Sequence, residues 1–131
     1  MSVADLQQLD PLTVAALSIA GSDSSGGAGL QADLKTFSAF DVFGATAVTA
    51  VTAQNTAGVR GVEPLSPQLL GDQIEACLED LPIRAAKTGM LANASLIDVV
   101  ADAWRSEAAP ALVLDPVMVA TSGARPLDES A

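Results

Sequence analysis

Two charged side chains occupy positions in the sequence where a charge needs a partner. Lys87 lies within the apolar run 83–90, where a cation is costly unless it meets a phosphate or a carboxylate. Asp33 stands at helical spacing from Leu30 and Phe37, which places its carboxylate on the buried edge of an expected helix. Such a carboxylate must be paired or must accept a hydrogen bond from a ligand. The alternatives are a solvent-exposed Lys87 and a purely structural Asp33.

Three further side chains stand next to apolar runs and could contact a ligand. Asp115 follows such a run, and in a site that handles phosphate its carboxylate could bind Mg²⁺ directly or indirectly. The amide of Gln54 can donate and accept a hydrogen bond at once, which suits the edge of a heteroaromatic ring. Met90 could pack against an apolar or aromatic ligand. The alternatives are turn caps at Asp115 and Gln54 and core packing at Met90.

The segment 21–29, with the sequence GSDSSGGAG, is a glycine- and serine-rich turn ahead of an expected helix. Amide groups at a helix N-terminus favour an anion or a polar ligand. The glycine spacing does not strictly match either of the two common nucleotide-phosphate motifs, so the loop also fits a tight turn that needs glycines. Near the end of the chain, Thr121, Ser122 and Gly123 could add hydroxyl and amide donors.

Alternating apolar patterns indicate the elements that would position these residues. Apolar runs rich in β-branched residues predict strands, and apolar residues at helical spacing, such as Leu34, Phe37 and Phe40, predict helices. Ser66 and Asn93 are the predicted N-caps of two helices. Strands alternating with helices predict an α/β fold with a mostly parallel sheet, whose ligands bind beyond the carboxyl ends of the strands. The expected strands are residues 14–20, 45–53, 59–65, 83–90 and 111–117, and the expected helices are residues 30–40, 67–80 and 94–106.

Composition excludes several classes of function. The 131 residues carry 6 basic and 16 acidic side chains, a formal charge of −10, which argues against binding to nucleic acid or to an anionic membrane. The sequence has no histidine, which excludes histidine-based triads, and its one cysteine, Cys77, is predicted to pack in the core. Because the sequence shows no long apolar segment and no signal-peptide pattern, we expect a cytoplasmic protein.

The order of the elements predicts a domain that continues beyond these residues. Residues 1–12 are expected to be a polar N-terminal extension, and residues 13–131 belong to one domain. The expected strand 111–117 looks central and buried, yet no helix follows it to cover it. A complete domain of this architecture has on the order of 250 residues. We therefore expect the N-terminal part of a longer protein.

Four segments together resemble a known family of kinases. The strings AGSDSSGGAGLQADLKTF, TAVTAQNT, KTGML and VLDPVMVATSG occur in the order found in the hydroxymethylpyrimidine/phosphomethylpyrimidine kinases of thiamine biosynthesis. The resemblance covers residues 14–125 and implies a ribokinase-like fold, in its N-terminal half only. It also implies ATP-dependent phosphorylation of the hydroxymethyl group of the pyrimidine and then of the resulting monophosphate.

The resemblance implies a role for several of these residues. Asp33 and Gln54 match positions that contact the pyrimidine, Met90 matches one that lies against its ring, and Gly21 lines the same pocket. Asp115 matches a position near the Mg²⁺ ion and the phosphates. The catalytic base and the anion hole of the family belong to a later G-T-G-C-type motif. We therefore predict no catalytic residue up to Ala131, and little or no activity for these residues alone.

Other functions fit the same residues. A pyridoxal kinase also acts on a hydroxymethyl heteroaromatic ring, so it is the nearest alternative activity. A non-catalytic protein that binds the pyrimidine or pairs with a partner is an alternative of another class. A fusion to thiamine-phosphate synthase is a third alternative, and the family resemblance suggests a homodimer.

Overall fold

The computed structural model of the chain describes residues 14–115 and 117, and the structural statements below concern these residues. Four strands form one sheet in the order β2-β1-β5-β6, and every neighbouring pair is parallel. They are β1 (Ala15–Ala20), β2 (Phe43–Val48), β5 (Ile83–Thr88) and β6 (Ala111–Leu114). The predicted mostly parallel sheet is confirmed.

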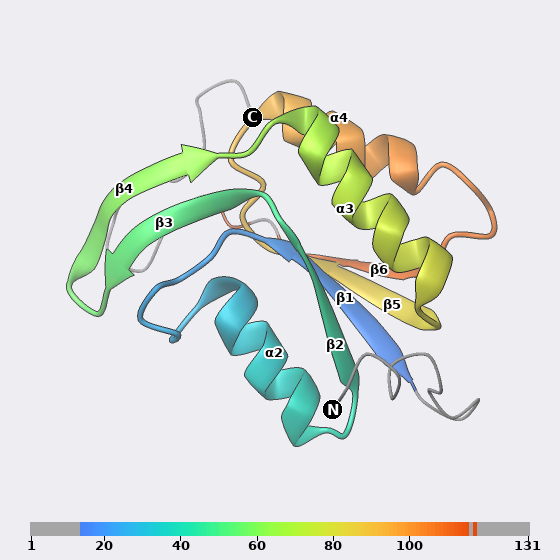
Figure 1. Cartoon of the computed structure of the whole chain (residues 1–131), viewed down its shortest axis with the longest axis horizontal. Helices are drawn as coiled ribbons and strands as arrows, with labels where there is room; N and C mark the ends of the chain where they lie inside the picture. Colours follow the sequence, from blue (N-terminus) through green and yellow to red (C-terminus); the bar gives the residue numbers. More distant parts are fainter. Residues whose placement is uncertain (1–13, 116, 118–131) are drawn as a thin grey trace.

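Helices cover both faces of this sheet. Figure 1 shows α2 (Gly29–Ala39) on one side and α3 (Pro67–Asp80) and α4 (Ala94–Ala103) on the other. Ser66 and Asn93 cap α3 and α4, each accepting a hydrogen bond from the backbone N–H three residues further on, as predicted. The helix predicted over residues 94–106 ends earlier, at Ala103.

The main core lies between the sheet and the α3–α4 pair. Its fully buried side chains come from β1, α3 and α4, and they are Leu17, Ile19, Leu70, Ile74 and Leu96. Cys77 is half-buried against this core, in agreement with its expected packing role.

On the other face, α2 buries Leu30, and Leu34 and Phe37 lie over Gly44 of β2. Phe40, the last residue of the helix predicted over residues 30–40, lies just beyond the end of α2. Phe40 is 76% exposed because the helix has already ended there, and its backbone occupies the C-cap position.

The second predicted strand is two strands, which corrects the sequence-based prediction. The main sheet keeps β2 only as far as Val48, and after Thr49 the chain enters β3 (Ala50–Asn55). This strand pairs antiparallel with β4 (Gly58–Pro64) in a separate two-stranded hairpin, which extends away from the sheet in Figure 1. The split occurs because β1, the neighbour of β2, ends at Ala20, so β3 finds its partner in β4 instead.

The last strand is more exposed than predicted. Among the described residues β6 lies at the edge of the sheet, and Val113 and Leu114 are 60% and 68% exposed. Among the described residues of β6, Leu112 alone packs against the core. The expected extension 1–12, Pro116 and the expected donors Thr121, Ser122 and Gly123 lie outside the described residues.

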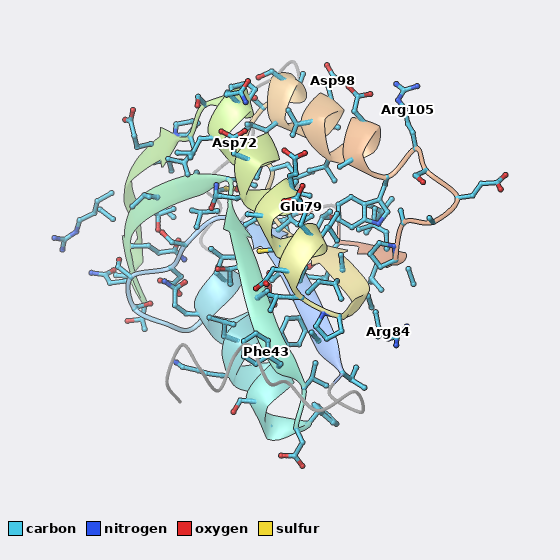
Figure 2. The ribbon with its side chains drawn as sticks, turned by 45° about the vertical axis from the view of Figure 1, so that its right-hand side comes forward. Phe43, Asp72, Glu79, Arg84, Asp98 and Arg105 are labelled. Carbon is cyan, nitrogen blue, oxygen red and sulfur yellow. The ribbon has the colours of Figure 1, made fainter. Side chains whose placement is uncertain are left out.

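Acidic side chains gather on the outer surface of the helices. Figure 2 shows Asp72 and Glu79 on α3 and Asp98 on α4 projecting away from the sheet, and all three are exposed. None of the helices within residues 14–115 has the length and apolar character needed to cross a membrane.

Candidate functional site

Asp33 is held by one residue from each of two neighbouring strands. Ser18 of β1 and Lys87 of β5 are register partners, so their side chains project from the same face of the sheet, toward α2. Ser18 Oγ donates a 2.6 Å hydrogen bond to Asp33 Oδ2, and Lys87 Nζ lies 3.1 Å from both carboxylate oxygens. The Asp33 side chain is 18% exposed. The carboxylate is therefore paired, as its position on the helix requires, and its partners are side chains.

Asp115 approaches the same lysine from the end of β6. Its Oδ2 atom lies 3.6 Å from Lys87 Nζ, and its backbone N–H donates to Thr88 O at 3.3 Å. The Asp115 side chain is 54% exposed, so its carboxylate keeps lone pairs directed to solvent. Lys87 thus lies between two carboxylates, one mostly buried and one open to solvent.

Gly21 and Met90 meet next to this cluster. A Cβ atom added to Gly21 would overlap the terminal methyl of Met90, so the thioether lies directly against the glycine. Thr49 Oγ1 donates a 2.7 Å hydrogen bond to Met90 O, which fixes the Met90 backbone beside the point where β2 ends. Gly89 is closely packed nearby, because a Cβ there would stand 2.9 Å from Ala20 Cβ and 3.3 Å from Lys87 Nζ.

The glycine-rich loop, residues 21–28, holds an anion of its own. The buried carboxylate of Asp23 accepts hydrogen bonds from the N–H groups of Ser25, Gly27 and Ala28, at 2.8–2.9 Å, and from the Ser25 hydroxyl at 2.8 Å. Burial opposes the charge of Asp23, but these hydrogen bonds outweigh it and lower the pKa of its carboxyl. These three amides are occupied by Asp23 and are not free to bind an external anion, which corrects the interpretation of the loop as an anion site for these amides.

Gln54 lies on β3 beside the glycine-rich loop. Its backbone contacts Ser24, and Oε1 stands 3.5 Å from Thr52 Oγ1, whose hydroxyl already donates to Ser22 O at 2.7 Å. None of the hydrogen bonds within the described residues joins Gln54 to Asp33, Lys87 or Asp115. The predicted site residues thus form two groups at the rim of the sheet: Asp33, Lys87 and Asp115 in one, and Gly21, Met90 and Gln54 around the loop.

Sequence reasoning missed three polar residues that organise this region. Ser18 had a usable signal, because it is the one polar residue of the strand AALSIA and is fully buried there. Asp23 had another, because an aspartate two residues before a serine in a glycine-rich turn favours hydrogen bonds to the following amides. Ser24 had none, because its partner Gln54 is distant in the sequence.

The donors present fit a hydrated magnesium ion better than a fully protein-bound metal. Within the part of the chain that the structure describes, no group of three or more carboxylate, imidazole or thiol side chains could hold a metal ion. Mg²⁺ commonly uses one or two carboxylates and keeps several water or phosphate oxygens as ligands. The half-exposed carboxylate of Asp115 meets that requirement.

Comparison with known proteins identifies the fold and the family of this chain. The arrangement is that of a ribokinase-like kinase domain, with a mostly parallel sheet and flanking helices. The family model of phosphomethylpyrimidine kinase matches residues 23–131, and the chain belongs to that family. The hydroxymethylpyrimidine/phosphomethylpyrimidine kinase of Helicobacter pylori is 61% identical over 115 residues, which are 88% of this chain and 43% of that protein.

Solved structures agree with this family. The crystal structure of phosphomethylpyrimidine kinase from Clostridium difficile has a TM-score of 0.81 and 48% sequence identity, and the match covers 89% of this chain and 51% of that one. Pyridoxal kinase from Staphylococcus aureus in complex with AMP-PCP and pyridoxal has a TM-score of 0.71 at 39% identity, over 81% of this chain and 40% of that one. The chain therefore spans about half or less of the length of these three relatives.

Proposed function

We propose that the full protein phosphorylates hydroxymethylpyrimidine and then its monophosphate, with ATP as the donor. In the first reaction the hydroxymethyl oxygen bonds to the γ-phosphorus, the bond from that phosphorus to the bridging oxygen breaks, and ADP leaves. The hydroxyl proton passes to a base that the family resemblance assigns to a motif after residue 131. In this proposal the described residues supply substrate binding and charge.

One observation carries the proposal: Lys87 lies between Asp33 and Asp115 at the carboxyl ends of parallel strands, in a chain of this family. Phosphoryl transfer depends mainly on positioning and on electrostatic stabilisation. The mostly buried carboxylate can hold the lysine in place. On its exposed side the lysine can then bind the negative charge of a phosphate.

The remaining side chains suit a flat heteroaromatic substrate. Asp33 Oδ2 already accepts from Ser18 and Lys87, whereas Oδ1 accepts from Lys87 alone and keeps a lone pair for an N–H donor on a ring substituent, such as an amino group. Gln54 offers an amide donor and acceptor, and the Met90 thioether against Gly21 offers an apolar wall. We assign Asp33, Gln54, Met90 and Gly21 to the pyrimidine.

ATP and Mg²⁺ are part of the proposal. Asp115 would hold the ion through one carboxylate, and Lys87 would face the phosphates from the opposite side. When bound, Mg²⁺ neutralises phosphate charge and orients the transferred group. ATP use is supported by the ATP analogue bound to the S. aureus relative.

Turnover by the full protein tests this function. Purified protein is incubated with ATP, Mg²⁺ and hydroxymethylpyrimidine, and both phosphorylated products are measured with ADP. We expect both products, and a loss in kcat/KM of about 100-fold or more in Asp33→Asn, because the variant amide exchanges an acceptor for a donor. Asp41→Asn, an exposed change outside the site, is the matched control. Absence of pyrimidine-dependent ADP formation by the natural protein would exclude the proposal.

Pyridoxal kinase is the second candidate, because a pyridoxal kinase has a similar fold at 39% identity. The higher TM-score and identity of the C. difficile pyrimidine kinase favour the first candidate. We expect kcat/KM for hydroxymethylpyrimidine to exceed that for pyridoxal when both are assayed with the same enzyme. The reverse order would assign the protein to pyridoxal. The expected homodimer and cytoplasmic location belong to the same proposal, and light scattering of the full protein tests the dimer.

A further inference from the structure

Serine side chains join the hairpin β3–β4 to the glycine-rich loop. Ser22 Oγ accepts a hydrogen bond from Thr52 N at 2.9 Å, and Thr52 Oγ1 donates to Ser22 O at 2.7 Å. Two residues further along both segments, Ser24 Oγ accepts from Gln54 N at 2.8 Å and donates to Gln54 O at 2.6 Å. The loop thus runs beside β3 like a short extra strand, with serine hydroxyls in place of part of the backbone ladder.

The Ser24 contact falls where the regular pairing of the hairpin is interrupted. The register between β3 and β4 shifts between Ala53 and Gln54, so the regular ladder is interrupted next to Gln54. A two-stranded hairpin is also marginally stable without outside contacts. The hydroxyl of Ser24 forms hydrogen bonds with both the N–H and the carbonyl of Gln54. These two hydrogen bonds hold the Gln54 backbone where the β3–β4 pairing is irregular.

The loop itself is rigid enough to act as a support. The Asp23 carboxylate ties down the amides of Ser25, Gly27 and Ala28, and the Asp23 N–H donates to Gln31 Oε1 of α2 at 2.8 Å. Ser24 lies between these anchored residues. The backbone of Ser24 is therefore held in place, and its hydroxyl lies next to β3.

We propose that Ser24 is a positioning residue for Gln54. Its hydroxyl fixes the Gln54 backbone and so determines where the Gln54 amide is held at the rim of the sheet. That Gln54 contacts the substrate rests on the function proposed above, whereas the hydroxyl contact is independent of it. Ser24 would therefore contribute to substrate specificity through Gln54, without touching the substrate itself.

Hydrogen exchange of the full protein, followed by NMR, tests the support without any substrate. Ser24→Ala should raise the exchange rate of the Gln54 amide about tenfold, because its acceptor is lost. Ser24→Thr keeps the hydroxyl and should restore protection. Ser38→Ala, an exposed serine of α2, is the control. A Gln54 amide that exchanges equally fast in the Ser24→Ala variant and the natural protein would overturn the proposal.

Kinetics separate positioning from a general loss of stability. We expect Ser24→Ala to raise KM for the pyrimidine about tenfold while kcat changes less than about twofold. In a Gln54→Ala background the same substitution should leave KM unchanged, because Ser24 acts through Gln54. An additive effect in that background, or a loss confined to kcat, contradicts the proposal. If the natural protein shows no turnover, the proposed function fails, and the exchange experiment still decides the role of Ser24.

Discussion

Lys87 Nζ stands 3.1 Å from each carboxylate oxygen of Asp33, although the two residues are 54 positions apart in the sequence. The contact joins β5 to α2 across the face of the sheet. Ser18, the register partner of Lys87 on β1, adds the third member of the group. The Asp33 carboxylate of α2 is therefore held by a cation from β5 and a hydroxyl from β1.

Replacement of Lys87 tests how much its contacts with Asp33 and Asp115 contribute to stability and to activity. Lys87→Met leaves Asp33 and Asp115 facing each other without the cation between them, and we expect a loss of about 1–3 kcal/mol in the free energy of unfolding, less than for a fully buried pair. We also expect kcat/KM to fall about 100-fold. Urea unfolding and steady-state kinetics of the full protein measure the two effects.

A second lysine on α2 provides the control for this experiment. Among the described residues Lys35 Nζ makes a single exposed hydrogen bond, to Gly26 O, so Lys35→Met should change the free energy of unfolding by less than about 0.5 kcal/mol. Equal effects of the two substitutions would show that the position of Lys87 between the carboxylates is unimportant.

Asp23 makes the stability of the loop depend on pH. Its hydrogen bonds lower the pKa of the carboxyl below the reference value of 3.8, so the folded protein binds its proton less tightly than the unfolded chain does. The resulting stabilisation is complete above about pH 5 and is lost as the pH falls through the folded pKa. Asp23→Asn should cost about 1–3 kcal/mol at pH 7, since hydrogen bonds to a charged group are lost.

The pH dependence distinguishes this charge effect from a packing defect. The difference in free energy of unfolding between the natural protein and Asp23→Asn should shrink from pH 7 to pH 3, whereas Ser38→Ala, which removes no titratable group, should show no such trend. Urea unfolding at several pH values measures it. A difference of constant size across that range would mean that the carboxylate charge does not hold the loop.

The sequence predicted most of the sheet and both helix caps because those features depend on local patterns. Asp33 and Lys87 were accessible for the same reason, since a charge on an apolar face or within an apolar strand stands out. The division at Thr49 was not accessible, because residues 45–53 contain no glycine or proline to mark it and the change of partner is decided by where β1 ends. The Ser24–Gln54 contact depends on that division and could not be predicted either.

Two glycines at the loop ends should respond differently to alanine. At Gly29 the backbone has φ of +55°, and a Cβ would overlap the carbonyl oxygen of Gly21, which cannot move freely. At Gly21 a Cβ would overlap only the flexible end of Met90. We therefore expect Gly29→Ala to cost about 2–4 kcal/mol and Gly21→Ala less than about 1 kcal/mol.

Gly21→Ala should affect substrate binding more than it affects the stability of the fold. Gly21→Ala displaces the Met90 thioether from the proposed pyrimidine wall, so KM should rise although the fold is retained. Thermal unfolding and the KM for hydroxymethylpyrimidine measure the two effects. An unchanged KM in a folded Gly21→Ala protein would remove Gly21 and Met90 from the proposed pocket.

The thiol of Cys77 should react slowly with alkylating reagents. Burial raises the pKa of its thiol above the reference value of 9.0, and the negative charge of Asp80 raises it further, so little thiolate exists at pH 8. Alkylation by iodoacetamide, followed by mass spectrometry of the peptide that contains Cys77, should be about tenfold or more slower than that of free cysteine. Asp80→Asn removes one of the two causes and should speed the reaction, whereas Asp98→Asn on α4 should not. Reaction of Cys77 at the rate of free cysteine, or equal rates in both variants, would contradict the packing of this helix face against the core.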